Sequence, residues 1–292
     1  MKHIINWTVW SLLALYLLLI GATRLPFCQA FIGNKVAQAL GDKLGTQVSV
    51  GRVDIGLLNR IILDDVNILD QQNKRMLGIS RLSASIDLIP LTDGKIRISS
   101  AQLFGARAQF YQKDSLSKPN FQFVIDSLAS KDTTSHTPLD LRVNTFIVRH
   151  SSVSFDRQDV AQTPGQFNPQ HLNVSDISAH VLLKALTDDS LNVQIKRLGF
   201  QEQSGISVNR LALRLHADKK QARLREFLLE MPSSRLQIDS LDASYQWDEK
   251  GLVTSSLIYS GTIDNSFITP SDLRAFHPSL KNFQRQIALS SH

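Results

Sequence analysis

The stretch ISAHVLLKALTDDSLNVQI (177–195) decides the fold class of this chain. The apolar residues of its first half are spaced two apart: Ile177, Ala179, Val181 and Leu183. A period of two is the spacing of a β-strand with one apolar and one polar face. Asp188-Asp189-Ser190 then supplies a turn signal, after which the alternation restarts at Leu191. The stretch therefore predicts two neighbouring antiparallel strands.

The same period of two begins near Val48 and continues over most of the chain up to residue 265. Turn signals such as Thr92-Asp93-Gly94 and Asp218-Lys219-Lys220 separate the alternating segments. Short connections of this kind join neighbouring antiparallel strands. We therefore predict a mainly β protein, with an extended antiparallel sheet over residues 47–265.

The predicted sheet has an apolar face and few helices that could cover it. Two interpretations remain open, since both have the same period: a second sheet closes a sandwich, or the sheet curves into a hydrophobic groove that binds an apolar ligand. In the groove, acyl chains would contact the alternating apolar side chains. The candidate groove residues are Leu82, Ala84, Ile86, Leu88, Ile96, Ile98, Ala106, Ala108, Phe110, Ile177, Ala179, Val181, Leu183, Leu211, Leu213 and Leu215.

The N-terminal segment from Ile4 to Ala22 is apolar and carries no charge. At about 1.5 Å per residue an α-helix over it would be roughly 28 Å long, close to the thickness of a bilayer core. A cleavable signal peptide is the alternative, but the apolar run exceeds a signal core and Arg24 follows it. We therefore expect residues 1–26 to form a short stub and an uncleaved transmembrane anchor. Its candidate membrane residues are Trp7, Trp10, Leu12, Leu15, Leu18 and Ile20.

The orientation of this anchor rests on few charges, since only Lys2 precedes the apolar run. A short N-terminal stub is not easily exported, whereas a long following domain can be carried across the membrane. We therefore expect a single-pass protein with a cytoplasmic N-terminus and an extracytoplasmic bulk.

Two further segments flank the predicted sheet. Over residues 27–46 apolar residues recur every fourth position before Gly45, which predicts an amphipathic helix that caps the sheet or, alternatively, lies on the membrane. Over residues 266–292, Thr269-Pro270-Ser271-Asp272 predicts an N-cap and a short helix. The last residues resemble the start of another strand, so we expect the natural chain to be longer.

Composition and motifs argue against several functions. Lys and Arg exceed Asp and Glu by 32 to 26, and the basic residues form no stripe, so we expect no nucleic-acid partner. The single cysteine, Cys28, excludes an internal disulfide and a Cys-based zinc site. The eight histidines lack metal-ligand spacing, and no phosphate-binding loop or nucleophile motif occurs. We therefore expect no catalytic residues, no cofactor and no metal.

Several segments resemble the N-terminal region of the TamB proteins of the AsmA-like superfamily. They are GNKVAQALGDKLGTQVSVGRVDIG (33–56), ILDDVNILD (62–70), LSASIDLIPLTDGKIRISSAQLFGARAQFY (82–111), NFQFVIDSLASKD (120–132), VRHSSVSFDRQD (148–159) and LNVSDISAHVLLKALTDDSLNVQIKRLGFQEQSG (172–205). The resemblance covers most of the chain. Its general pattern is shared across AsmA-like proteins.

This resemblance implies an inner-membrane protein of a double-membrane bacterium, with a periplasmic β-groove that conducts phospholipid between the membranes. It also implies support for the translocation and assembly of outer-membrane proteins, together with an outer-membrane β-barrel of the Omp85 type. The family's C-terminal region, which engages that barrel, has no counterpart here. A scaffold that pairs its sheet edge with client β-strands is the alternative function.

Overall fold

The computed structural model describes residues 7, 10, 11, 13–16, 18, 21, 25–55, 60–87, 96–129, 139–140, 144–187, 190–248 and 251–291. The chain divides into two compact units. The first comprises Met1–Ser99 with Asn120–Leu141, and the second comprises Ser100–Pro119 with Arg142–His292. The prediction of a mainly β protein with a mostly antiparallel sheet is confirmed.

The first unit combines short strands with two helices. Its described elements are α2 (Pro26–Leu44), β1 (Val48–Ser49), β2 (Arg52–Ile55), β3 (Arg60–Leu69), β4 (Arg75–Asp87), the start of β5 (Ile96–Gln112), α3 (Gln122–Ala129) and β6 (Leu139–Asp140). Strands β1, β2 and β4 all pair antiparallel with β3. The short β6 pairs in parallel with the first residues of β5.

Helix α2 packs against β1 and β2, where the four-residue spacing placed a helix. It ends at Gly45, whose φ of 68° is left-handed and whose N–H donates to the Gly41 carbonyl over 2.7 Å. Leu44 is buried there, as is Val53 of β2. The Ser127 hydroxyl of α3 donates to the Leu44 carbonyl over 3.4 Å. The two helices therefore contact one another at one end of α2.

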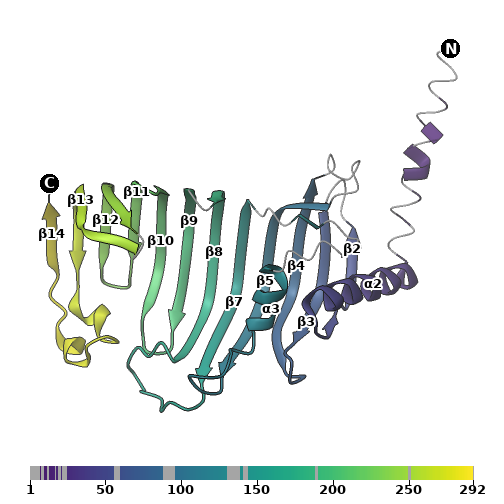
Figure 1. The fold of residues 1–292 in the computed structure, drawn as a ribbon, viewed down its shortest axis with the longest axis horizontal. Helices are drawn as coiled ribbons and strands as arrows, with labels where there is room; N and C mark the ends of the chain where they lie inside the picture. The colour runs from purple at the N-terminus through teal and green to yellow at the C-terminus, as the bar shows by residue number, and fades with distance from the viewer. Residues whose placement is uncertain are drawn as a thin grey trace. The chain divides into compact units, whose positions relative to one another are not determined.

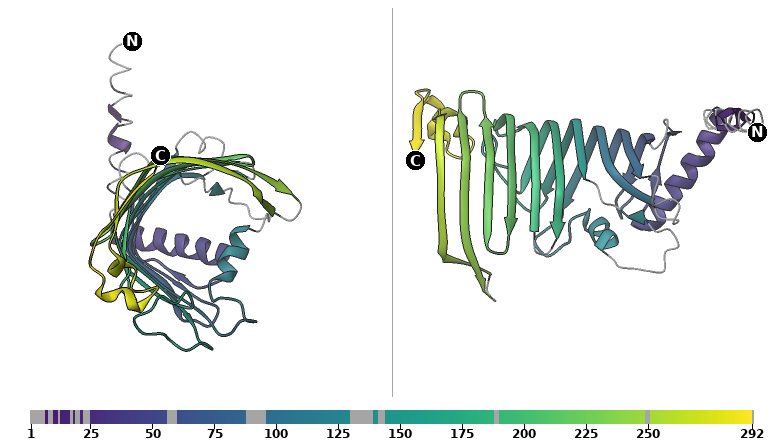
Figure 2. Two further views of the ribbon diagram at one scale, coloured as in Figure 1. Left: turned by 90° about the vertical axis from the view of Figure 1, so that its left-hand side faces the viewer. Right: turned by 90° about the horizontal axis from the view of Figure 1, so that it is seen from above.

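The second unit is an array of long strands (Figure 1). After β5 come β7 (Thr145–Arg157), β8 (His171–Thr187), β9 (Ser190–Glu202), β10 (Ser207–Asp218), β11 (Gln221–Glu230), β12 (Arg235–Asp248), β13 (Gly251–Ile268) and β14 (Ile287–Ser291). Each strand pairs with the next in chain order. Within the unit the strands lie side by side in one layer and bend along their length (Figure 2).

One pairing in this array departs from the predicted antiparallel pattern. Strands β5 and β7 run parallel, from the Ser100–Thr145 pair to the Gln112–Arg157 pair. Parallel neighbours require a connection that returns the chain to its starting end. Residues 113–144, which include α3, provide that return, and the sequence pattern gave no sign of it.

Bulges interrupt five strands of the second unit at residues with positive φ. They are Gly105 in β5, His150 in β7, Asp176 in β8, Glu226 in β11 and Asn265 in β13. Register shifts flank the bulges of β7, β8, β11 and β13. A bulge adds one residue to a strand and bends it. These bulges explain how the strands bend while the ladder of hydrogen bonds continues on both sides.

Each bulge also coincides with a change in the parity of the apolar positions. In β8 they are even-numbered before Asp176, at Leu172 and Val174, and odd-numbered after it, from Ile177. An inserted residue would move every following side chain to the other face unless the sequence changed phase with it. The change of parity therefore keeps the apolar residues on one face along the whole strand.

The predicted membrane anchor lies at the N-terminal end of the chain. Of the predicted membrane residues, Trp7, Trp10, Leu15 and Leu18 are exposed, and Leu12 and Ile20 lie outside the described residues. Among the described residues, no helix has the length and apolarity needed to cross a bilayer. The transmembrane anchor therefore stays a prediction.

At the other end, the chain forms two 3₁₀ helices, η2 (Pro270–Leu273) and η3 (Pro278–Asn282), before β14. Thr269 occupies the N-cap position of η2 and Pro270 begins the helix, as predicted, but the Thr269 side chain makes no capping hydrogen bond. The Thr269 hydroxyl instead donates to the Ser233 carbonyl in the turn between β11 and β12. This contact ties the segment to the end of a neighbouring hairpin.

Candidate functional site

The candidate site is the apolar face of the second unit's sheet. One row of apolar side chains crosses seven strands, and every adjacent pair in it is a register pair. The row is Leu103, Val148, Ala179, Leu198, Leu211, Leu229 and Leu236. Register partners point to the same face of a sheet. We call this row the central apolar row.

Two further rows lie beside it on the same face. The first contains Ala101, Phe146, Val181, Ile195 and Leu213. The second contains Leu183, Val193, Leu215, Leu224 and Leu241. Together with the central apolar row they form a surface of apolar side chains that is continuous across the strands. We call this surface the apolar face.

The apolar face is not covered by other described parts of its unit. The second unit's only described helices are η2 and η3, and its described strands form a single layer. Only four of its described apolar residues are buried: Ala106, Ile206, Val208 and Ala275. The described residues of the rows are otherwise half-buried, apart from the exposed Phe146. A second sheet, as in a closed sandwich, does not occur among the described residues of this unit.

The opposite face carries charged and polar side chains, several of them in ion pairs. Arg225 of β11 donates to both carboxylate oxygens of Asp242 in β12, over 2.7 and 2.8 Å. Arg214 of β10 pairs with Glu226 of β11 over 3.0 Å. Two-sided strands of this kind separate a surface for apolar contact from a surface for water.

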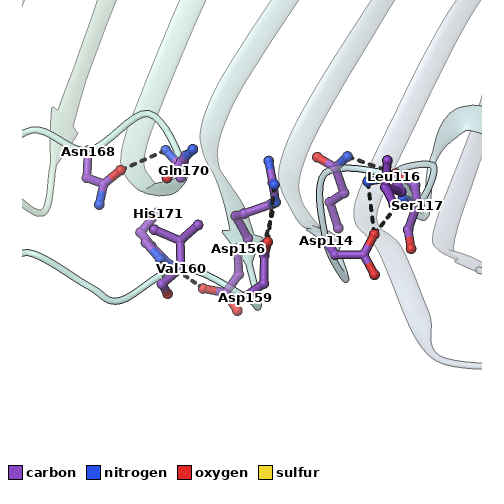
Figure 3. Close-up of polar contacts among 11 residues, drawn as sticks. Asp114, Leu116, Ser117, Asp156, Asp159, Val160, Asn168, Gln170 and His171 are labelled. Carbon is purple, nitrogen blue, oxygen red and sulfur yellow. Dashed lines mark hydrogen bonds and ion pairs between the residues drawn. The ribbon is translucent and has the colours of Figure 1, made fainter.

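The strand ends next to the loops are fixed by polar contacts (Figure 3). His171 is buried, and its Nδ1 lies 2.6 Å from Asp156 Oδ1. Its Nε2 lies 2.9 Å from the carbonyl oxygen of Val160, which can only accept. His171 thereby ties the loop over residues 158–170 to the end of β7. The scattered-histidine interpretation from sequence missed this structural role.

A second turn at this end is organised by Asp114 (Figure 3). Its Oδ1 accepts from the backbone N–H groups of Leu116 and Ser117, over 3.0 and 2.7 Å. Hydrogen bonds from Ser117, through its side chain and its backbone, lower the pKa of the Asp114 carboxyl. Leu116 at the tip of the turn is 96% exposed. These contacts shape a loop and bring together no catalytic pair.

The predicted groove residues fall in different places. Ala179, Val181, Leu183, Leu211, Leu213 and Leu215 belong to the three rows, whereas Ala108 and Phe110 pair with Val153 and Phe155 beyond the bulge. Ile177 pairs with Ser151 at the bulge, and Ala106 is buried. Leu82 and Ala84 lie in the first unit, paired with Leu63 and Ile61. The structure gives the strands but not the side chains of three further candidates, Ile86, Ile96 and Ile98. Leu88 lies outside the described residues.

The sequence interpretation did not include several members of the rows, above all Leu103, Val148, Leu198 and Leu229. Each lies close to a bulge or register shift, where strict alternation fails. The signal for them was present in the sequence as a change of parity between apolar pairs. A period-two template that allows one added residue would have found them.

Neither a metal site nor a relationship to a known family points to another functional site in the described residues. Among the described residues, no group of three or more His, Cys, Asp or Glu side chains is arranged to hold a metal ion. In comparisons with known proteins, the chain matches no family model and no curated protein. The apolar face is therefore the candidate binding surface of this protein.

Proposed function

We propose that this protein binds phospholipid acyl chains on the apolar face of its second unit and conducts them across the strands. The observation that carries the proposal is the central apolar row, which crosses seven strands without a polar member. An acyl chain is long, apolar and flexible, and it matches a continuous apolar surface better than a compact ligand would. The bend of the strands within this sheet (Figure 2) supports the proposal of a groove.

The energetics favour an apolar ligand. The Leu residues of the row are half-buried, and covering the rest of one such side chain contributes about 1 kcal/mol. Several such contacts would offset much of the free-energy cost of moving an acyl chain through water. Because every side chain of the row is apolar, no single position is a deep free-energy minimum for the acyl chain. The acyl chain can then move from strand to strand.

The wider setting of the proposal follows from the TamB and AsmA-like resemblance. We place the protein in the inner membrane, with its N-terminus in the cytoplasm and the two units in the periplasm. There it takes part in outer-membrane biogenesis by conducting phospholipid, by supporting outer-membrane protein assembly, or by both. An Omp85-type barrel is the partner that the resemblance implies.

Site-specific photocrosslinking in the full chain tests the proposal. A benzophenone amino acid at Leu213 faces the apolar side, whereas one at the adjacent Arg214 faces the opposite side. Irradiation in cells followed by mass spectrometry should find phospholipid attached at position 213 and little at 214. Equal labelling at the two positions, or none at 213, would contradict lipid binding on this face.

A second candidate function is strand addition at the edge formed by β13. Strand β14 pairs only with the part of β13 from Ile263 to Ile268. The preceding part of β13 has no charged residue, and Ile258 and Tyr259 are 73% and 72% exposed. An uncharged, exposed strand edge is a template for pairing with another strand. Ile258→Lys should abolish crosslinks to client β-strands and leave lipid labelling at position 213 unchanged.

A further inference from the structure

A cluster of basic side chains lies on the polar face of the second unit, opposite the apolar face. Its members come from three neighbouring strands: Arg149 of β7, His180 of β8, and Lys196 and Arg197 of β9. We call them the basic cluster. All except His180 are exposed.

The bulge in β9 brings two of these cations together. His180 pairs in register with Arg197, and the next pair is Val181 with Ile195. Lys196 is therefore the added residue, so two residues of β9 oppose one of β8. The register therefore places Lys196 and Arg197 together, next to His180 as the third basic group. This arrangement costs stability, because like charges directly opposite one another destabilise a sheet.

The cations of the cluster act on the imidazole of His180. Burial lowers the pKa of His180, and the charges of Lys196 and Arg149 lower it further. Both neighbouring strands, β7 and β9, therefore present cations to this imidazole. The nearest acidic residue along β8 is Asp176, four positions before His180.

The basic cluster differs from several other cations of this face. Arg214, Arg225 and Arg235 each have a carboxylate of a neighbouring strand within ion-pair distance. In the part of the chain that the structure describes, no carboxylate lies within that distance of Arg149, Lys196 or Arg197. A group of cations placed together without acidic partners is complementary to an anionic surface.

An exposed aromatic ring adjoins the cluster. Phe104 of β5 is the register partner of Arg149 and is 49% exposed. Its ring packs edge-on against His150, with centroids 5.4 Å apart. Cations beside an exposed apolar ring are typical of surfaces that lie at the headgroup level of a bilayer.

We propose that the basic cluster docks the protein on the surface of an anionic phospholipid bilayer. The guanidinium and ammonium groups would bind headgroup phosphates, and Phe104 would enter the interface beside them. A bilayer is favoured over an acidic protein because the exposed ring adjoins the cations. This inference is independent of acyl-chain binding, which uses the other face of the sheet.

Vesicle flotation of the full chain tests the inference. The chain is held in nanodiscs of phosphatidylcholine and mixed with vesicles of phosphatidylcholine, with or without phosphatidylglycerol. Flotation should require phosphatidylglycerol. It should be lost when salt rises from about 0.05 to about 0.5 M, because the Debye length falls.

Matched variants assign the binding to the cluster. The double variant Lys196→Gln/Arg197→Gln should bind the anionic vesicles roughly 25-fold more weakly, at about fivefold for each basic residue. Arg223→Gln removes one exposed cation of the same face, which lies 3.9 Å from Asp242, and should bind as the parent does. Phe104→Ser should weaken binding several-fold.

Three outcomes would overturn the inference. The first is equal flotation of the parent and the double variant, and the second is the absence of flotation with anionic vesicles. The third is retention on immobilised polyglutamate without vesicle binding, which would assign the cluster to an acidic protein. Lipid labelling at position 213 is read separately, so failure of vesicle docking leaves the acyl-chain proposal standing.

Discussion

Gly105 of β5 and His150 of β7 occupy equivalent positions on two parallel strands, and both have positive φ angles, 63° and 48°. Each directly follows the register pair Phe104–Arg149. The two bulges are therefore matched, so the register of the parallel pair is the same on both sides of them. A matched pair of bulges bends both strands together and preserves the pairing.

This relationship predicts how the two positions respond to substitution. A β-branched residue is strongly disfavoured at positive φ, so Gly105→Val and His150→Val should each lower the free energy of unfolding by about 1–2 kcal/mol. His150→Gly relieves the same backbone strain and serves as the control. Urea unfolding monitored by circular dichroism measures the differences. Equal stability of the Val and Gly variants at position 150 would refute the role of the backbone conformation.

The buried His171 should stabilise the loop over residues 158–170. His171→Ala removes the partner of the Asp156 carboxylate and of the Val160 carbonyl, which should cost about 1–3 kcal/mol, since the partly exposed carboxylate can turn to water. Hydrogen exchange of the loop should accelerate. Asp159→Asn is the control, because it breaks only the ion pair with the neighbouring Arg157 and should cost no more than about 1 kcal/mol. A loop that exchanges at the parent rate in His171→Ala would rule out the anchoring role.

The turn between β10 and β11 should contribute to the acid sensitivity of the protein. Hydrogen bonds from the Lys220 backbone, followed by those from Gln221, lower the pKa of Asp218. A carboxyl whose folded pKa is depressed stabilises the fold above its unfolded pKa of about 3.9. That contribution is lost as the pH falls through the folded pKa. Asp218→Asn should therefore flatten the acid limb of the melting temperature against pH. An unchanged acid limb would assign it to other carboxyls.

Charge on the apolar face should affect lipid and leave the fold intact. Leu211→Lys places an ammonium group in the central apolar row, where it would repel acyl chains, and the half-buried site lets the ammonium reach water. Lipid extracted with the purified full chain should fall several-fold. Arg210→Lys, at the exposed adjacent position, is the matched control. Lipid content equal in the two variants would argue against the row as the binding surface.

The sequence was sufficient to predict the fold class, because alternation of apolar and polar residues dictates strands. It was also sufficient for the helix that ends at Gly45, since a glycine there has the left-handed conformation that closes a helix. These features depend on local spacing. The prediction of one polar and one apolar face for each strand depends on the same spacing.

What the sequence interpretation missed depends on long-range pairing. The parallel β5–β7 pair depends on where the chain returns after residues 113–144, which no period encodes. The bulges at His150 and Asp176 were hidden because a break in alternation resembles the end of a strand. The anchoring role of His171 depends on Asp156 and Val160, which only the folded loop brings to it.

The single layer of the second unit has a consequence for how it unfolds. Each strand there pairs only with its neighbours, so the stability is close to a sum of nearest-neighbour terms, as in repeat proteins. Hairpins such as β10–β11 close short loops, whereas β5–β7 closes the long connection over residues 113–144. The β7–β14 hairpin array can therefore form first, and β5 joins it in the slowest step.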